Sequence, residues 1–80
     1  MALEAKVGRT GETGVDRVVL EQYPEGVYVY VFERPDSRFP EWDHLQDDWD
    51  MAKRACAQDY GIALDVWKEI PDTSLHGPHN

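Results

Sequence analysis

One stretch of the chain alternates valine with an aromatic residue at every step: Val27-Tyr28-Val29-Tyr30-Val31-Phe32. Successive side chains of a β-strand point to opposite faces of a sheet, so this stretch predicts a strand that is apolar on both sides. Valine side chains require only packing, whereas phenol hydroxyls require water or a hydrogen-bonding partner. We therefore expect the valine side to lie beneath a helix and the aromatic side to lie opposite it.

A β-hairpin is predicted on the N-terminal side of this stretch. Residues 17–23 are also rich in β-branched and apolar types, and Pro24-Glu25-Gly26 separates the two segments. Proline suits a type I turn and glycine suits the left-handed position of a following bulge, which together make a three-residue loop. This loop pairs Val19 with Val31, and it therefore places Leu20 on the aromatic side of the sheet.

A helix and a third strand are predicted after the hairpin. The helix is indicated by apolar residues at spacings of three and four: Trp42, Leu45, Trp49, Ala52, Cys56 and Tyr60. Pro40 suits the first turn of such a helix, and Gly61 suits the left-handed cap after its last turn. Residues 63–70 are predicted to form a strand that ends at Pro71. A helical crossover predicts that this strand runs parallel to the second, either next to it or one place removed.

The predicted fold is a small α+β domain of order β-β-α-β, with one helix on one face of a three-stranded sheet. This domain covers residues 16–70. Residues 1–15 contain three glycines and no periodic apolar pattern, so they are predicted to be a flexible arm. Residues 71–80 contain two prolines and mostly polar residues, and they are predicted to be a flexible tail.

Length and composition narrow the class of protein. A length of 80 residues is enough for one small domain but not for two hydrophobic cores. An apolar content of 41% is too high for a disordered acidic segment. A single cysteine cannot form a disulfide framework, so a reducing, cytoplasmic location is expected. The sequence shows no apolar run long enough to span a membrane and no apolar segment typical of a secretory signal.

The net charge of −8 argues against two kinds of partner. Nucleic acids and anionic lipid surfaces are polyanions that bind clustered cations, whereas the lysines and arginines here are scattered along the sequence. An aromatic sheet face is typical of single-stranded RNA platforms, but those need a cationic groove. Glu21, Glu33 and Asp65 are expected near this face, which disfavours RNA.

The uncovered aromatic face is the predicted partner-binding surface. An open apolar patch on a small domain usually marks a contact surface, and tyrosine and tryptophan are enriched in interfaces. We expect a protein partner or a homodimer to use a set of apolar residues there: Tyr28, Tyr30, Phe32, Trp67 and Leu20. Two alternatives stay open, in which the arm or tail folds over this face, or the two faces are reversed.

A metal-dependent hydrolase is the alternative function. Its residues would be the acidic group at the predicted helix start: Asp43, His44, Asp47 and Asp48. Residues four apart share one side of a helix, which can place metal ligands or an acid–base pair together. A solvated acidic helix face is the simpler interpretation, so we expect no catalytic residue, no metal and no cofactor. Cys56 falls on the apolar stripe, where a thiol acts as a small buried hydrophobe.

Several positions in the second half of the chain carry a resemblance to a known kind of small domain: His44-Leu45-Gln46-Asp47-Asp48-Trp49, Ala52, Ala55, Asp59-Tyr60-Gly61 and Trp67. Over residues 17–70 the chain resembles a family of small uncharacterised bacterial domains. These pair a tyrosine-rich hairpin with one helix that ends in Tyr-Gly and a short strand that carries tryptophan. The family has no known activity, so the resemblance implies a fold and supplies no catalytic residue.

Overall fold

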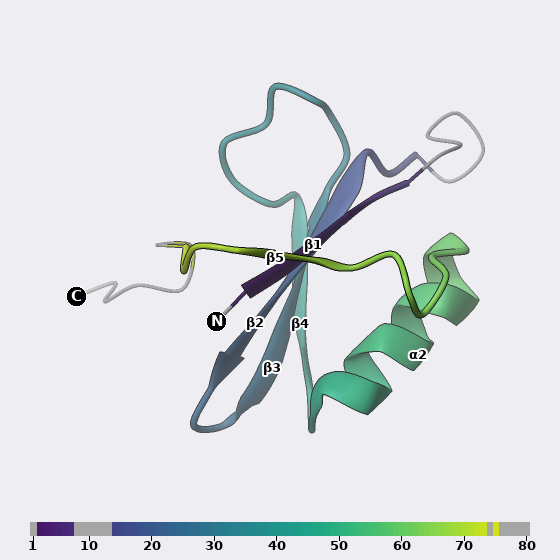
Figure 1. Cartoon of the computed structure of the whole chain (residues 1–80). Helices are drawn as coiled ribbons and strands as arrows, with labels where there is room; N and C mark the ends of the chain where they lie inside the picture. The colour runs from purple at the N-terminus through teal and green to yellow at the C-terminus, as the bar shows by residue number, and fades with distance from the viewer. Residues whose placement is uncertain (1, 8–13, 74, 76–80) are drawn as a thin grey trace.

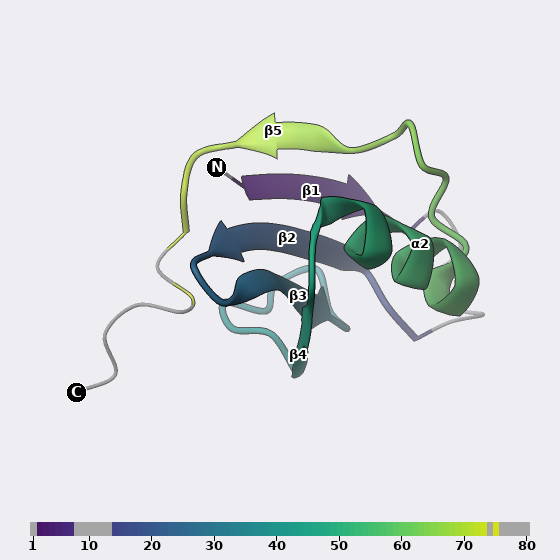
Figure 2. The ribbon, with the colours of Figure 1, turned by 90° about the horizontal axis from the view of Figure 1, so that it is seen from below.

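The computed structural model describes residues 2–7, 14–73 and 75. The described residues form one helix and a five-stranded antiparallel sheet in the order β4-β3-β2-β1-β5 (Figures 1 and 2). The elements in chain order are β1 (Ala2–Lys6), β2 (Arg17–Tyr23), β3 (Gly26–Phe32), β4 (Trp42–Gln46), α2 (Trp49–Tyr60) and β5 (Lys68–Ile70). The predicted α+β class is confirmed, but the prediction of three strands is wrong.

Strand β1 occupies the segment that was predicted to be the start of a flexible arm. It pairs with β2 on one side and with β5 on the other, so it is an interior strand of the sheet. Its apolar residues Leu3 and Ala5 are buried beside Val7. The arm prediction is therefore wrong for residues 2–6, and its residues 8–13 lie outside the described part of the chain.

Strand β5 is shorter than predicted and runs in the other direction. Only residues 68–70 form a strand, and they pair antiparallel with β1 at an edge of the sheet (Figure 2). The predicted parallel arrangement is wrong, because every neighbouring pair in the sheet is antiparallel and two strands, β2 and β1, separate β5 from β3. After α2 the chain instead crosses the sheet to the far edge, where β1 has an unpaired side.

The hairpin of β2 and β3 is present, but its register differs from the prediction by one residue. Tyr23 pairs with Gly26, so the turn contains only Pro24 and Glu25 instead of a three-residue loop. Because side chains alternate along a strand, a shift of one residue exchanges the two faces of β2. Leu20 consequently pairs with Val29 on the valine side.

The helix begins later than predicted. Residues 42–46 form β4, an edge strand, and α2 starts at Trp49 after the N-cap Asp48, whose carboxylate accepts from the backbone N–H of Met51 at 2.9 Å. The predicted C-terminal end is confirmed, since Gly61 caps α2 with a positive φ of 69°. An N-cap carboxylate satisfies a helix donor that would otherwise lack a partner, which fixes the start of α2 at this position.

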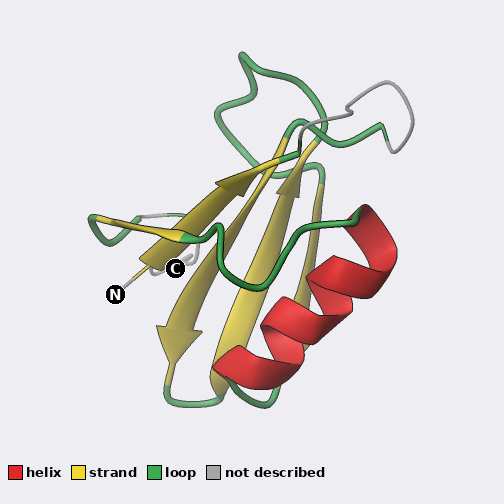
Figure 3. Ribbon diagram, turned by 45° about the vertical axis from the view of Figure 1, so that its right-hand side comes forward, coloured by secondary structure: helices red, strands yellow, loops and turns green. Residues whose placement is uncertain are grey.

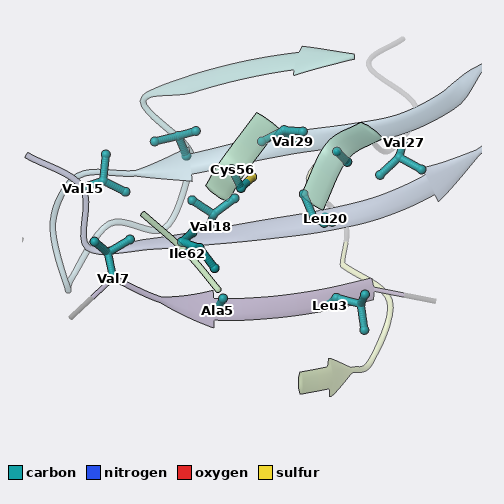
Figure 4. Packing of buried hydrophobic residues seen from close by; sticks show 12 residues of the cluster. Leu3, Ala5, Val7, Val15, Val18, Leu20, Val27, Val29, Cys56 and Ile62 are labelled. Atoms are coloured by element: carbon teal, nitrogen blue, oxygen red, sulfur yellow. The ribbon is translucent and has the colours of Figure 1, made fainter. Parts of the chain in front are cut away.

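Helix α2 covers one face of the sheet, and the main core lies between them (Figure 3). Ala52 and Cys56 are the fully buried residues of the helix, and Val18, Leu20 and Val29 lie around Cys56 (Figure 4). The valine side of β3 therefore faces the helix, as predicted. Within the described residues, the model has no helix that combines the length and apolar character of a membrane span.

Candidate functional site

The side of the sheet opposite α2 carries the aromatic residues of β3, and we call it the tyrosine face. Its centre comprises Tyr28, Tyr30 and Phe32 with Val19 and Glu21, which the register places beside them on β2. These three aromatic residues were predicted to lie together, and the structure places them so. Lys6 pairs with Arg17 and Lys68 pairs with Glu4, so both lysine side chains point to this face as well.

The structure does not place the other two predicted contact residues on the tyrosine face. Leu20 is fully buried in the core beneath α2, which follows from the corrected hairpin register. Trp67 precedes β5 and packs against the same core from the crossing segment. Their predicted placement is therefore wrong, and neither side chain can contribute to a surface on the tyrosine face.

The C-terminal segment covers part of the tyrosine face. Tyr30 is 1% exposed and Phe32 is 2% exposed, and Leu75 packs against their cluster. Glu21 anchors this segment, because its carboxylate accepts from the backbone N–H of Thr73 at 2.8 Å and from the Thr73 hydroxyl. The expectation of a fully uncovered face is thus wrong, and the alternative of a covering tail holds for residues 73 and 75.

Arg17 holds the segment between β3 and β4 against the other end of this face. Its guanidinium donates to the carbonyl oxygens of Arg34 at 3.3 Å and Ser37 at 2.9 Å. The same group lies 4.1 Å from the centre of the Phe32 ring, which is a cation–π contact. The Asp16 carboxylate lies 3.3 Å from the guanidinium of Arg17 and compensates its charge. Arg17 therefore has a structural role.

Glu41 fixes the same segment from its C-terminal end. Its carboxylate accepts from the backbone N–H of Glu33 and from the Ser37 hydroxyl, both at 2.8 Å. These hydrogen bonds to the charged form hold the pKa of Glu41 below its usual value. Residues 33–41 are therefore a fastened loop that can present side chains at defined positions.

A hollow of about 360 Å³ lies on the tyrosine face between this loop and the C-terminal segment. Most of its wall is apolar, and it is lined by Glu4, Arg17, Val19, Phe32, Arg38, Phe39, Ile70, Thr73 and Leu75. Phe39 is 73% exposed at its rim. Among the described residues, this hollow is the place where a large exposed aromatic ring, that of Phe39, lies next to an apolar depression.

The tyrosines of this face form a stacked group beside the hollow. The rings of Tyr28 and Tyr30 stack at 6.0 Å, and Tyr23 meets Tyr28 edge to face at 5.6 Å. Burial, followed by the hydrogen bond to Glu21, raises the pKa of Tyr23 to about 12. Burial is also the main cause that raises the pKa of Tyr30, whose hydroxyl has no hydrogen-bond partner among the described residues. These phenols therefore stay neutral near neutral pH.

The acidic residues of the hydrolase alternative do not share one helix face. Asp43 and His44 lie on β4, where consecutive side chains point to opposite faces, and Asp48 is occupied as the N-cap of α2. Asp47 lies in the turn between these elements. In the described part of the chain, no three His, Cys, Asp or Glu side chains converge with metal-ligand geometry. The prediction that these residues share one side of a helix is therefore wrong.

Cys56 is buried as predicted. Its side chain has no exposed surface beneath β2 and β3, and burial, with a smaller contribution from Asp59, raises the pKa of the thiol to about 12. A nucleophilic cysteine requires a thiolate near neutral pH. The thiol therefore packs as a small apolar group.

Of the residues that line the hollow, Phe32 alone belonged to the predicted contact set, and the loop residues Arg38 and Phe39 are among those that it lacked. Arg38 and Phe39 lie in a segment that was considered only as the connection to a helix. A large aromatic residue flanked by an arginine and by Pro40 in a loop was the available signal, because loops commonly carry binding residues.

Comparisons of the chain with protein-family models, with curated proteins and with solved structures found no match.

Proposed function

We propose that the protein is a non-enzymatic interaction module that binds a second copy of itself through the tyrosine face. The observation that carries this proposal is the exposed ring of Phe39 at the rim of an apolar hollow on the same face. A twofold dimer brings one patch of each copy together, so the patch must complement itself. A projecting ring and a receiving hollow on one face meet that requirement.

The distribution of charge supports the choice of a second copy. A protein of net charge −8 repels its copy over most of its surface. The tyrosine face carries both signs, because the exposed cations Lys6, Arg38 and Lys68 accompany the acids Glu4 and Asp43. Arg38 has no ion pair among the described residues, which leaves its charge available to an acid of the second copy.

The size of the molecule is sufficient for a dimer of this kind. Its principal dimensions are 35 × 27 × 19 Å, and stable interfaces bury roughly 800 Å² on each partner. Phe39 is an aromatic residue near the centre of the proposed contact, where such residues contribute most of the binding free energy. Replacing it should therefore weaken the dimer more than any loss of rim charge.

Sedimentation equilibrium over a range of protein concentrations tests the proposal. We expect the wild type to form dimers and Phe39→Ser to remain monomeric, with an increase in the dissociation constant of at least about tenfold. Met51→Ser is the matched control, since Met51 is 47% exposed on α2 and lies on the other side of the molecule. A wild type that is monomeric at every concentration, or equal weakening by both variants, would disprove the proposal.

A further inference from the structure

Strand β4 is an edge of the sheet with an open outer side. It pairs with β3 and stands at one end of the strand order, with β5 at the other end. Among the described residues, no backbone hydrogen bond joins its outer side to another segment. An open strand edge offers a row of N–H and C=O groups that can accept another strand.

The two edges of this sheet differ in how they are protected. The β5 edge has three residues, includes the exposed Lys68 and is followed at once by Pro71, and these features discourage strand addition. The β4 edge has five residues, Trp42–Gln46, and contains neither lysine nor proline. It also exposes Trp42 by 63% and Leu45 by 46%, so the open backbone is accompanied by apolar contact surface. The β4 edge is therefore the better template for an added strand.

The charges along β4 determine what kind of strand can be added. Asp43 and Asp47 are exposed and have no ion pair among the described residues, and Glu33 lies beside Trp42, whose indole N–H donates to it at 2.7 Å. This hydrogen bond also fixes the Trp42 ring, and an exposed indole flanked by a carboxylate attracts a lysine or arginine side chain. The edge favours a cationic strand.

The same charges disfavour a second copy of this chain at the β4 edge. An antiparallel β4 pair centred on His44 would place Glu41 opposite Asp47 at both ends of the contact. A pair shifted by two residues would place Asp43 opposite Asp47 or opposite its own copy. Like charges directly opposite each other destabilise a strand pair.

We infer that the β4 edge binds an extended, basic segment of another protein, which adds antiparallel to β4 as a sixth strand. Main-chain hydrogen bonds to β4 supply affinity for any extended segment. Lysine or arginine side chains next to Asp43, Asp47 and Trp42 supply the preference for a basic one. The β4 backbone edge lies apart from the proposed dimer contact at Phe39, but Asp43 lies on the tyrosine face as well. The two inferences are therefore separated by the titration with Phe39→Ser described below.

The experiment is a calorimetric titration of the protein with a short peptide that alternates lysine with valine. We expect saturable binding that weakens as salt is added, because exposed charges are screened. The double variant Asp43→Lys/Asp47→Lys should bind this peptide about tenfold more weakly. The double variant Asp59→Lys/Asp65→Lys is the matched control, since it changes the net charge equally at exposed positions outside β4. Equal weakening in both variants would overturn the inference.

A second titration separates strand addition from general attraction between charges. The same peptide with N-methylated backbone amides should fail to bind, because it cannot donate main-chain hydrogen bonds. Binding of the methylated peptide at unchanged affinity would overturn the inference.

The titration is repeated with Phe39→Ser, which should bind the lysine–valine peptide as the wild type does whether or not a dimer forms. Dissociation of a wild-type dimer by the peptide would mean that β4 meets a second copy, and it would overturn the assignment.

Discussion

The thiol of Cys56 illustrates how one buried side chain gives the fold a dependence on pH. Burial raises its pKa from 9.0 to about 12, so the folded chain retains this proton at pH values where the unfolded chain has lost it. The free energy of unfolding therefore falls as pH rises above about 9, and the loss continues toward the folded pKa. The stabilisation from this group is fully present at neutral pH.

We predict that Cys56→Ala makes the fold less sensitive to alkali. For the wild type, one raised pKa contributes a slope of up to about 1.4 kcal/mol per pH unit. Urea unfolding between about pH 9 and 10 measures this slope. The tyrosines with raised pKa add to the slope in both proteins, so the difference between the two slopes reports the thiol. The variant should be less stable at neutral pH because of the lost sulfur, but its slope should be shallower. Identical slopes in the two proteins would contradict the prediction.

Gly26 sets the geometry of the hairpin between β2 and β3. Its φ is 147°, a conformation that L residues rarely adopt, and a Cβ atom there would overlap the carbonyl oxygen of Gln46 on β4. The same Cβ would lie 3.2 Å from the Cδ1 atom of Leu45. The residue thus permits both the two-residue turn and the close approach of β4 to the start of β3.

We predict that Gly26→Ala lowers the free energy of unfolding by about 2–4 kcal/mol, because backbone strain and overlap with β4 add together. Gly61→Ala is the control, since Gly61 also has a positive φ but open space around it, and its cost should be about 1 kcal/mol. Urea unfolding of the two variants and the wild type measures both values. An equal cost at the two positions would show that contact with β4 does not matter.

The hairpin also shows what the sequence could and could not predict. The alternation of valine with aromatic residues in β3 predicts a strand and identifies its two faces, because burial of the valines requires that pattern. The turn is ambiguous, since Pro24-Glu25-Gly26 fits a loop of either two or three residues. One residue of difference exchanges the faces of β2, which is why Leu20 was assigned to the wrong surface.

Strand β4 was predicted as helix for a physical reason. The spacing of Trp42, Leu45 and Trp49 matches one side of a helix, and both strand residues are exposed at the edge, so burial imposes no alternation on them. Only the later residues Ala52 and Cys56 are buried at helical spacing, and Gly61 caps the helix as predicted. Edge strands carry the weakest sequence signal because little of their surface is buried.

The candidate site was predictable to a similar extent. Tyr28, Tyr30 and Phe32 share a face because they lie two residues apart on one strand, which sequence alone establishes. The loop residue Phe39 lies over that face only because Arg17 and Glu41 fasten residues 33–41. Contacts between segments that lie far apart in the chain leave no recognisable pattern in the local sequence, so they could not be predicted.

The place of β1 decides how the whole molecule is assembled. This strand lies between β2 and β5, and its residues Leu3 and Ala5 contribute to the core beneath α2. Their alternation with Glu4 and Lys6 is a strand signal, but it is too short to distinguish from a polar arm. Without β1, the segment after α2 has no strand to pair with.

We predict that removing residues 2–6 abolishes the cooperative unfolding transition, because it exposes the β2 edge and leaves β5 without its partner. Near-ultraviolet circular dichroism should lose the signal of the packed tryptophans, and a synthetic peptide of residues 1–7 should restore it by inserting between β2 and β5. A peptide of the same composition in scrambled order should not restore it, since only the native order places Leu3, Ala5 and Val7 on the core side. If the shortened chain kept a cooperative transition of unchanged midpoint, β1 would be dispensable and the antiparallel sheet would have to close without its interior strand.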